Sequence, residues 1–133
     1  MIVLDTHVLV WWVNDAPQLS SAASAAIEQE LQSPVGLVAV SAITAWEIAM
    51  LVSLGRLSLT MGVDDWISEI SAVEGLQFLP VDTAVAIEST RLPGQFHKDP
   101  ADRMIVALAR HLNAPLLTAD EKIRHYEHVR TLW

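Results

Sequence analysis

Short apolar runs recur along this chain between longer helical segments, and this alternation constrains its fold more than any other feature. Three of the runs are apolar throughout or nearly so, at residues 2–4, 37–40 and 116–118. Strands that are apolar on both faces are typical of a parallel sheet covered by helices on both sides. The pattern therefore predicts an α/β fold, a three-layer α/β/α sandwich of Rossmann-like type around a mostly parallel central sheet of four to five strands.

The expected helices are bounded by capping residues, glycine and proline. Ser20 and Ser21 cap an alanine-rich helix, Gly55 ends an apolar one, and Pro80 restricts its strand to a sheet edge or a strand end. We expect helices at residues 6–13, 21–31, 41–54, 61–73, 82–91 and 100–112 and after Asp120, and further strands at residues 76–81 and 128–132. No repeat or linker interrupts this order, so the sequence predicts one domain spanning residues 1–133.

The charges are unevenly distributed along the chain. The net charge is −8, which argues against a general nucleic-acid coat protein, because surfaces that bind phosphate are normally basic. Seven of the eight Lys and Arg residues nevertheless lie between Arg91 and Arg130, and Arg56 is the exception. A local surface that binds phosphate is therefore compatible with the acidic composition.

Several classes of protein are excluded by what the composition lacks. There is no cysteine, which excludes disulfides, cysteine-based zinc sites and thiol catalysis. The N-terminus has no basic leader, and no apolar run approaches the ~18 residues needed to cross a membrane. We therefore expect a cytoplasmic protein that has no membrane segment. Its 52% apolar content is enough for a core and leaves apolar surface for a partner.

Four acidic residues are expected at one edge of the predicted sheet. Asp5 follows the first strand, and Asp120 follows the strand that ends at Thr118. Glu47 lies inside the helix after the second strand, and Asp102 lies in the first turn of a later helix. Ligands of open α/β sheets bind outside the carboxyl ends of the strands, so these side chains can converge there. Carboxylates that close repel one another, and a divalent ion relieves the repulsion; oxygen ligands alone favour Mg²⁺ or Mn²⁺ over zinc.

Three of these acids also have a structural interpretation as capping residues. Asp5 and Asp120 each precede a predicted helix, and an N-cap carboxylate accepts hydrogen bonds from the first backbone N–H groups. The segment Asp99-Pro100-Ala101-Asp102 likewise matches a cap, a proline at the first helical position and an acid at the third. Local sequence alone leaves capping and catalysis open for all three.

Glu47 fits the structural interpretation least well. It is the only ionisable residue from Ser41 to Gly55, on a helix that is otherwise apolar. A carboxylate in such surroundings needs solvent, a partner such as Arg103, or a metal ion, and a shared ion explains all four acids at once. Thr6 and Thr118 each neighbour an acid and can donate a hydrogen bond to it or satisfy local backbone. The five histidines show no metal-ligand spacing.

Four segments carry the acids in order along the chain. They read Ile-Val-Leu-Asp-Thr-His at residues 2–7, Val-Ser-Ala-Ile-Thr-Ala-Trp-Glu-Ile at 40–48, His-Lys-Asp-Pro-Ala-Asp-Arg-Met-Ile-Val-Ala at 97–107 and Leu-Leu-Thr-Ala-Asp-Glu-Lys-Ile at 116–123. In this order and spacing they resemble the VapC toxins, PIN-domain ribonucleases of bacterial toxin–antitoxin pairs, over essentially the whole chain. The resemblance implies a PIN-like fold and makes Asp5, Glu47, Asp102 and Asp120 the acidic quartet of the active site.

The resemblance also implies a chemistry and partners. The family binds Mg²⁺ or Mn²⁺ and cleaves RNA, often tRNA or rRNA. Its members commonly form homodimers, and a small VapB-like antitoxin inhibits them by laying a C-terminal segment across the active-site groove. On this basis Asp5 and Asp102 hold the principal ion, while Glu47 and Asp120 are outer ligands or ligands of a second ion.

Residues around the quartet receive roles from the same resemblance. Asp99 belongs to the Asp-Pro-x-Asp-Arg pattern and supports the ligand set. Arg103 or Lys98 steadies the phosphate, although Arg103 can equally orient a carboxylate.

Two other function classes compete with the ribonuclease. A receiver-type signalling domain would need an acidic pair near its first strand, whereas this chain has the single Asp5 there and a helical Glu47 instead of a central strand Asp. A PIN-like fold retained only as a non-catalytic binding protein would not need the intact quartet. The sequence favours the metal-dependent ribonuclease toxin.

Overall fold

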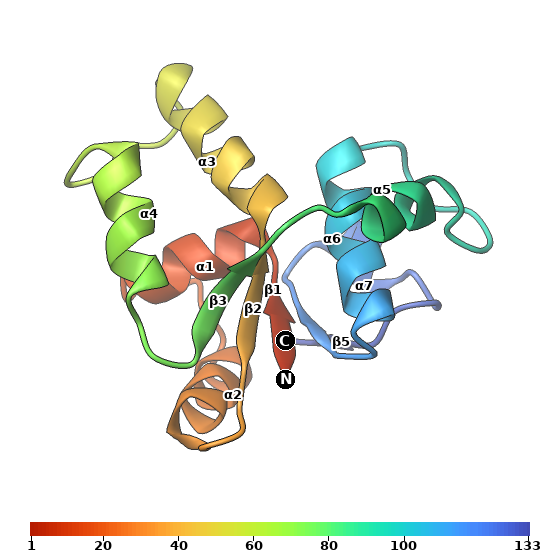
Figure 1. Cartoon of the computed structure of the whole chain (residues 1–133), viewed down its shortest axis with the longest axis horizontal. Coiled ribbons are helices and arrows are strands. Elements are labelled where there is room, and N and C mark those ends of the chain that lie inside the picture. The colour runs from red at the N-terminus through yellow and green to blue at the C-terminus, as the bar shows by residue number, and fades with distance from the viewer.

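The computed structural model describes all 133 residues and contains one sheet of five strands (Figure 1). The strands are β1 (Ile2–Leu4), β2 (Val38–Ser41), β3 (Leu76–Leu79), β4 (Leu116–Leu117) and β5 (Thr131–Leu132). The helices are α1 (Thr6–Val13), α2 (Ser21–Gln32), α3 (Ala42–Ser53), α4 (Val63–Ser71), α5 (Thr83–Thr90), α6 (Pro100–His111) and α7 (Glu121–Arg124). The predicted α/β/α sandwich is confirmed, and the sheet, in the order β3-β2-β1-β4-β5, is parallel throughout rather than mostly so.

Two hydrophobic cores cover the two faces of the sheet, because successive side chains of a strand point to opposite sides. Ile2 and Leu4 belong to the core that includes α1, α2 and α4, whereas Val3 belongs to the core built mainly by α6. Figure 1 shows these two groups of helices on opposite sides of the sheet. Both faces of each central strand are therefore buried, which is why these strands are apolar throughout.

The strand register brings polar residues to one edge of the sheet. Leu4 pairs with Val40 of β2 on one side and with Leu117 of β4 on the other. The next residues on the three strands therefore lie side by side at the carboxyl edge: Asp5, Ser41 and Thr118. The helices α1, α3 and α7 begin directly beyond this edge.

Three predicted boundaries are wrong by a few residues. The helix expected at 61–73 is shorter because Gly62, in extended backbone, is the N-cap of α4. The strand expected at 76–81 stops at Leu79, because Pro80 has no N–H for a strand ladder, and β3 is an edge strand as predicted. The last strand contains only Thr131 and Leu132 of the expected 128–132.

Apolar side chains remain exposed on and around α3. Trp46 is 55% exposed on this helix, and Leu54, its C-cap, is 57% exposed.

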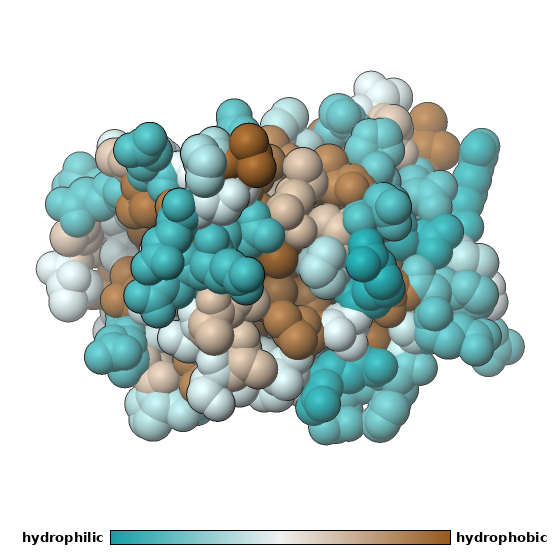
Figure 2. Space-filling view, turned by 90° about the horizontal axis from the view of Figure 1, so that it is seen from below, coloured by the Kyte–Doolittle hydropathy of each residue, from teal (hydrophilic) through white to brown (hydrophobic).

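At the opposite, amino edge of the strands, hydrophobic residues gather in the middle of the surface and hydrophilic residues border them (Figure 2). None of the helices combines the length and the apolar character that a membrane crossing requires.

Candidate active site

Asp5 is the most deeply buried of the four predicted acids. Its side chain accepts hydrogen bonds from Thr6 N at 2.8 Å through Oδ1 and from Thr118 Oγ1 at 2.7 Å through Oδ2. The residue is the N-cap of α1, so the capping interpretation is confirmed. Burial nevertheless raises the pKa of the Asp5 carboxyl, the hydrogen bonds from Thr118 and Thr6 oppose the rise, and the charge of Asp120 adds to it. Capping alone does not explain a carboxylate held in such an unfavourable environment.

Glu47 reaches the same edge from α3. Thr6 Oγ1 donates a hydrogen bond to Glu47 Oε1 at 2.5 Å, and Thr6 Oγ1 also lies 3.0 Å from Thr44 Oγ1. Burial raises the pKa of the Glu47 carboxyl, the Thr6 hydrogen bond lowers it, and the negative charges of Asp5 and Asp99 raise it further. Thr6 thus links two acids, since its backbone N–H binds Asp5 and its hydroxyl binds Glu47.

Asp102 occupies the third position of α6, as predicted. Asp99 is the N-cap and accepts a hydrogen bond from Asp102 N at 3.0 Å. Burial is the main cause that raises the pKa of the Asp102 carboxyl to about 7, and the nearby negative charges raise it further. These charges belong to the other three acids of the quartet and to the N-cap: Asp5, Glu47, Asp120 and Asp99.

Asp120 completes the group as the N-cap of α7. Its Oδ1 accepts hydrogen bonds from Lys122 N at 2.8 Å and from Ile123 N at 3.4 Å. The backbone N–H of Asp120 donates to Thr118 Oγ1 at 3.0 Å, and the same hydroxyl donates to Asp5. Thr118 is fully buried and therefore fixes Asp5 and Asp120 relative to each other.

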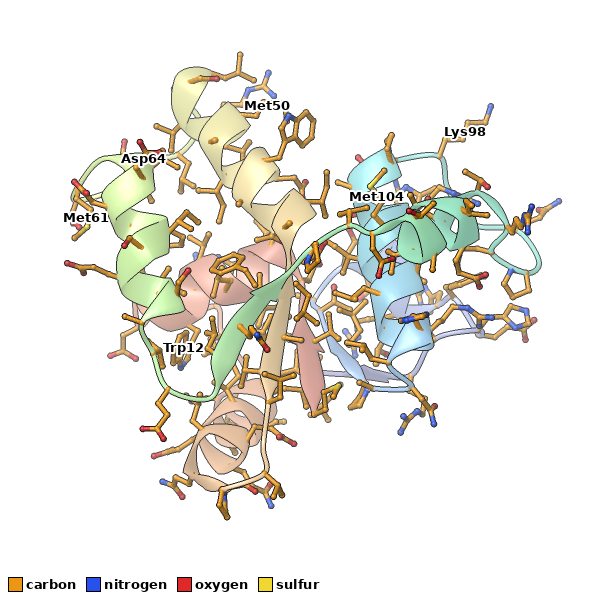
Figure 3. All side chains as sticks on the ribbon, viewed as in Figure 1. Trp12, Met50, Met61, Asp64, Lys98 and Met104 are labelled. Carbon is orange, nitrogen blue, oxygen red and sulfur yellow. The ribbon has the colours of Figure 1, made fainter.

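The two cations considered as helpers of the acids, Lys98 and Arg103, lie in the loop before α6 and at the start of that helix. Arg103 neither pairs with Glu47 nor orients another carboxylate: its guanidinium donates to the carbonyl oxygens of Ser89, Phe96 and His97 at 2.8 to 3.2 Å. These carbonyls belong to the end of α5 and to the loop before α6, so Arg103 fastens that loop. The Lys98 side chain extends outward into solvent from the same loop (Figure 3).

His97 is the contact that sequence reasoning missed. Its Nε2 lies 3.0 Å from Asp102 Oδ2, and this nitrogen is buried with no other polar partner. The sequence signal was weak, because the five histidines follow no metal-ligand spacing and His97 meets Asp102 only through the turn into α6. His97 can hold the Asp102 carboxylate in one orientation.

The donor set of this cluster fits a divalent metal ion. All four acids supply carboxylate oxygens, and the pKa values of Asp5, Glu47 and Asp102 are each raised in part by the charge of a neighbouring acid, a repulsion that a cation removes. No three His, Asp or Glu side chains are placed to hold one ion together. Mg²⁺ usually takes only one or two carboxylates and keeps several waters, so pairs of these acids suit it.

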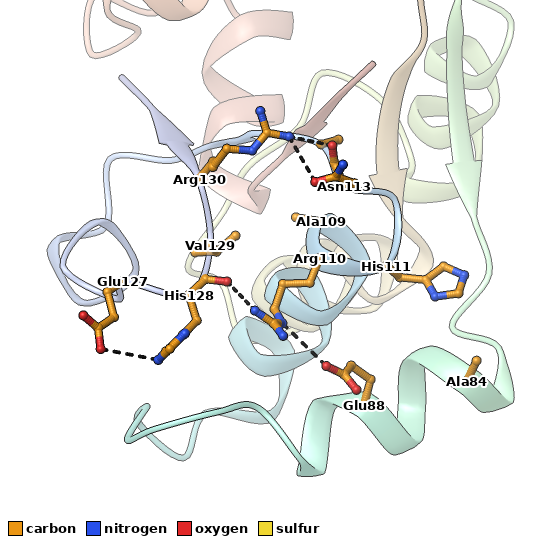
Figure 4. Close-up of a pocket in the computed structure, with 11 residues that line it drawn as sticks. Ala84, Glu88, Ala109, Arg110, His111, Asn113, Glu127, His128, Val129 and Arg130 are labelled. Carbon is orange, nitrogen blue, oxygen red and sulfur yellow. Dashed lines mark hydrogen bonds and ion pairs between the residues drawn. The ribbon is translucent and has the colours of Figure 1, made fainter.

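The hollows around the cluster differ in character. One of about 220 Å³ adjoins Asp5 and Asp120, and one of about 260 Å³ adjoins Glu47 and is walled by Trp46 and Met50. A larger one of about 420 Å³ lies between the loop before α6 and the segment around α7. A hollow of about 590 Å³, larger than these three, lies at the far end of α6 around Arg110 and contains none of the predicted site residues (Figure 4).

Comparisons with known proteins agree with this fold. Residues 2–129 match the family model described as PIN domain. Ribonuclease VapC22 of Mycobacterium tuberculosis is 35% identical over 134 aligned residues, which cover 99% of this chain and 98% of that protein.

Two solved structures share the fold across nearly the whole chain. VapBC2 from Rickettsia felis, crystallised with a DNA fragment from its promoter, gives a TM-score of 0.71 at 16% identity, covering 99% of this chain and 98% of that one. A toxin–antitoxin complex from Klebsiella pneumoniae gives a TM-score of 0.66 at 16% identity, covering 100% of this chain and 97% of that one. At these identities the likeness concerns the fold.

Proposed function

Because the chain belongs to the VapC-type branch of the PIN-domain family, we propose that it is the toxin of a type II toxin–antitoxin pair and a metal-dependent ribonuclease. One observation carries the catalytic part of this proposal. Acids from four separate elements, Asp5, Glu47, Asp102 and Asp120, share the carboxyl edge of the sheet, and three of them have raised pKa values there. Folding tolerates such a cluster at a cost in stability, which is typical of a functional site.

The ion that fits these oxygen donors is Mg²⁺ or Mn²⁺. Asp5 and Asp102 are the proposed principal ligands, with Glu47 and Asp120 as outer ligands or ligands of a second ion. When bound, such an ion supplies Lewis acidity toward water and toward the scissile phosphate.

The neighbouring side chains of this chain orient the carboxylates. Thr118 fixes one Asp5 oxygen, the Thr6 hydroxyl fixes one Glu47 oxygen, and His97 contacts one Asp102 oxygen. Each of these acids therefore keeps its other oxygen or lone pairs for an ion or for an ordered water. Partners of this kind are what hold metal ligands in their working orientation.

The proposed substrate is RNA, with tRNA or rRNA as the expected class, and the proposed location is the cytoplasm. The name of the 35% identical relative, a ribonuclease, supports the activity. Three cations lie near the acids in sequence and partly offset the negative charge that would repel the RNA phosphates: Lys98, Arg103 and Lys122. Of these, Arg103 contributes indirectly, through the loop that it fastens.

A VapB-like antitoxin and a second copy of the chain are the proposed protein partners. The toxin–antitoxin complex among the structural neighbours supports the first. The apolar hollow beside Glu47, walled by Trp46 and Met50, is suited to an antitoxin segment that covers the acids. Exposed apolar side chains such as Leu54 leave surface for a homodimer contact.

A cleavage assay with labelled RNA tests the proposal. Purified protein should cleave tRNA or rRNA in Mg²⁺ or Mn²⁺ and lose that activity in chelator, with recovery when the ion is restored. Cleavage that persists in chelator would refute the metal–carboxylate mechanism. Tight RNA binding without cleavage under any divalent ion would instead favour the non-catalytic binding protein.

A further inference from the structure

We propose that the hollow between the loop before α6 and the segment around α7 binds one unpaired nucleobase of the RNA, immediately beside the acidic cluster. This inference rests on the proposed ribonuclease function and adds a specificity subsite to it. The hollow has a volume of about 420 Å³, within the range of small-ligand pockets.

The wall of this hollow is unusually rich in flat rings. Five of its nine lining residues carry an aromatic or imidazole ring: Phe96, His97, His125, Tyr126 and His128. The ring centroids of Phe96 and Tyr126 lie 4.6 Å apart, and those of Tyr126 and His128 lie 5.4 Å apart. Tyr126 is only 6% exposed and packs behind the others, so the rings offered to a base are the partly exposed Phe96 and His128 and the exposed His125. Stacking on such rings is how proteins usually hold unpaired bases.

The loop that forms one side of the hollow is fixed before any ligand binds. Tyr126 Oη donates to Pro93 O at 2.5 Å, and Arg103 Nη1 donates to the carbonyl oxygens of Phe96 and His97. Gly94 has a φ of +66°, and a Cβ there would lie 3.3 Å from His128 Nε2. Glycine therefore allows both the backbone conformation and the close approach to His128. A preformed wall reduces the entropy lost on binding.

Two lining residues connect the hollow directly to the acids. His97 lines it and places Nε2 3.0 Å from Asp102 Oδ2. Lys122 lines it as well, and its backbone N–H donates to Asp120 Oδ1 at 2.8 Å. A base in this hollow therefore belongs to a nucleotide next to the phosphate at the acids, and the exposed ammonium of Lys122 is suited to the backbone of that nucleotide.

This placement predicts a preference for single-stranded or flipped-out nucleotides. A base inside a duplex is stacked and paired and does not reach the rings. Loops of structured RNA meet the requirement, whereas continuous duplexes do not.

The decisive experiment combines abasic RNA with a change in the wall. A short single-stranded RNA cleaved by the protein is compared with copies that lack one base at each position around the cut. In wild-type protein, one abasic position should lower kcat/KM about tenfold, the size of a stacking contact with one base. F96L keeps apolar bulk but loses the ring, so its kcat/KM on intact RNA should also be about tenfold below that of wild type. Removing the base from the RNA should not lower the kcat/KM of F96L further.

Matched variants separate the subsite from general effects on folding. F78L changes the other Phe of the chain, which is also partly buried but packs against the opposite core, and should keep the full abasic effect. K122Q should raise KM and reduce the salt dependence of KM. R56Q removes an exposed cation that is remote from the acids in sequence, and it should leave both KM and its salt dependence unchanged. Thermal unfolding of all four variants checks that they are folded.

The outcomes distinguish this subsite from the ribonuclease proposal. If RNA is cleaved but an abasic position weakens wild-type protein and F96L equally, the subsite is wrong and the ribonuclease stands. If no RNA is cleaved, the ribonuclease proposal fails, and the hollow is judged by titrating AMP into metal-free protein. Shifts of the His128 ring signals by NMR that are lost in F96L would then support a base site, and their absence would refute it.

Discussion

The two ends of α6 carry opposite charges that are compensated in different ways. At its C-terminal end, Arg110 Nη1 donates to His128 O at 2.6 Å and Arg110 Nε lies 3.5 Å from Glu88 Oε1 (Figure 4). Arg130 donates to Asn113 O at 2.6 Å at the same end. At the N-terminal end, the Asp102 carboxylate contacts His97 Nε2 at 3.0 Å but otherwise faces further carboxylates.

This difference separates structural charge from functional charge. Both ends follow the helix dipole, with acids at the N-terminus and cations at the C-terminus. At the N-terminal end the like charges add to the effect of burial and raise the pKa of the Asp102 carboxyl further, whereas at the C-terminal end the arginines bind carbonyl oxygens and Glu88. A hollow of about 590 Å³, larger than those beside the acids, lies at the compensated end, so pocket size alone points to the wrong end of the helix.

The largest effect on RNA cleavage is expected from removing the charge of Asp5, the carboxylate that Thr118 holds. D5N should lower RNA cleavage by more than about a hundredfold, because a hundredfold is already the upper loss when only a partner of a metal ligand is replaced. Initial cleavage rates in Mg²⁺ measure the change. E88Q, at the other end of α6, is the control and should keep wild-type rates; equal losses in both variants would break the comparison.

A smaller loss is expected when the acids remain and their support is removed. T118V keeps the shape of the side chain but removes the hydroxyl that binds Asp5 and Asp120, and should lower cleavage about 10- to 100-fold. Raising the Mg²⁺ or Mn²⁺ concentration should recover part of the loss, because the ligands are mispositioned and not absent. T90V, on an exposed turn of α5, is the matched change and should have no effect.

The free energy of unfolding of the metal-free protein should depend on pH through Asp102. Its folded-state pKa of about 7 is above the ordinary value of 3.8, so the folded state binds the proton more tightly than the unfolded state. The folded state is therefore destabilised above pH 7 and gains stability as the pH falls from 7 toward 4. Between pH 8 and pH 6 this group should change the free energy of unfolding by about 1 kcal/mol, measured by urea unfolding in chelator.

D102N serves as the matched protein for that measurement. It lacks the titrating carboxyl, so it should be more stable than wild type at pH 8, and the difference should shrink toward pH 6. Saturating Mg²⁺ should reverse the order at pH 8 by stabilising only wild type. If the difference in free energy of unfolding between D102N and wild type were constant across this pH range, the pKa of the Asp102 carboxyl would not be raised in the folded protein.

The smallest effect is expected at the compensated end. E88Q removes the charge opposite Arg110, but both side chains are about one-third exposed. We expect a loss in free energy of unfolding below about 1 kcal/mol, typical of a partly exposed ion pair. A loss of several kcal/mol would indicate that this pair, rather than the hydrogen bond to His128 O, holds the end of α6.

Much of this architecture is readable from local sequence. Runs such as 2–4 and 37–40 predicted buried strands because nothing in them is polar, and Pro80 predicted a sheet edge or a strand end, both of which β3 shows. The sequence left open whether Thr118 binds an acid or local backbone, and its hydroxyl does both, between Asp5 and the backbone N–H of Asp120. Short-range rules suffice for such features, because burial and capping act between close neighbours in the chain.

Other contacts are decided by segments that meet only in the folded chain. His97 contacts Asp102 because the loop before α6 turns back, and that turn depends on Arg103 and on Tyr126, a residue from beyond β4. The same packing directs Arg103 to loop carbonyls and away from Glu47, a pairing that the sequence had left open. Local sequence could not choose, because an arginine in the first turn of a helix reaches carboxylates and loop carbonyls equally well.

By itself, the sequence determined the α/β class, the strands and the positions of Asp5, Glu47, Asp102 and Asp120 along the chain, since alternation and capping are local properties. Only the tertiary structure decided that the acids lie at a single edge, where the charges of neighbouring acids raise the pKa values of three of them. The parallel register aligns Asp5 with Thr118, and α3 and α6 reach the same edge. The tertiary structure also decided that a wall of rings adjoins the acids. Charge repulsion and desolvation depend on distance in space, and the fold alone sets those distances.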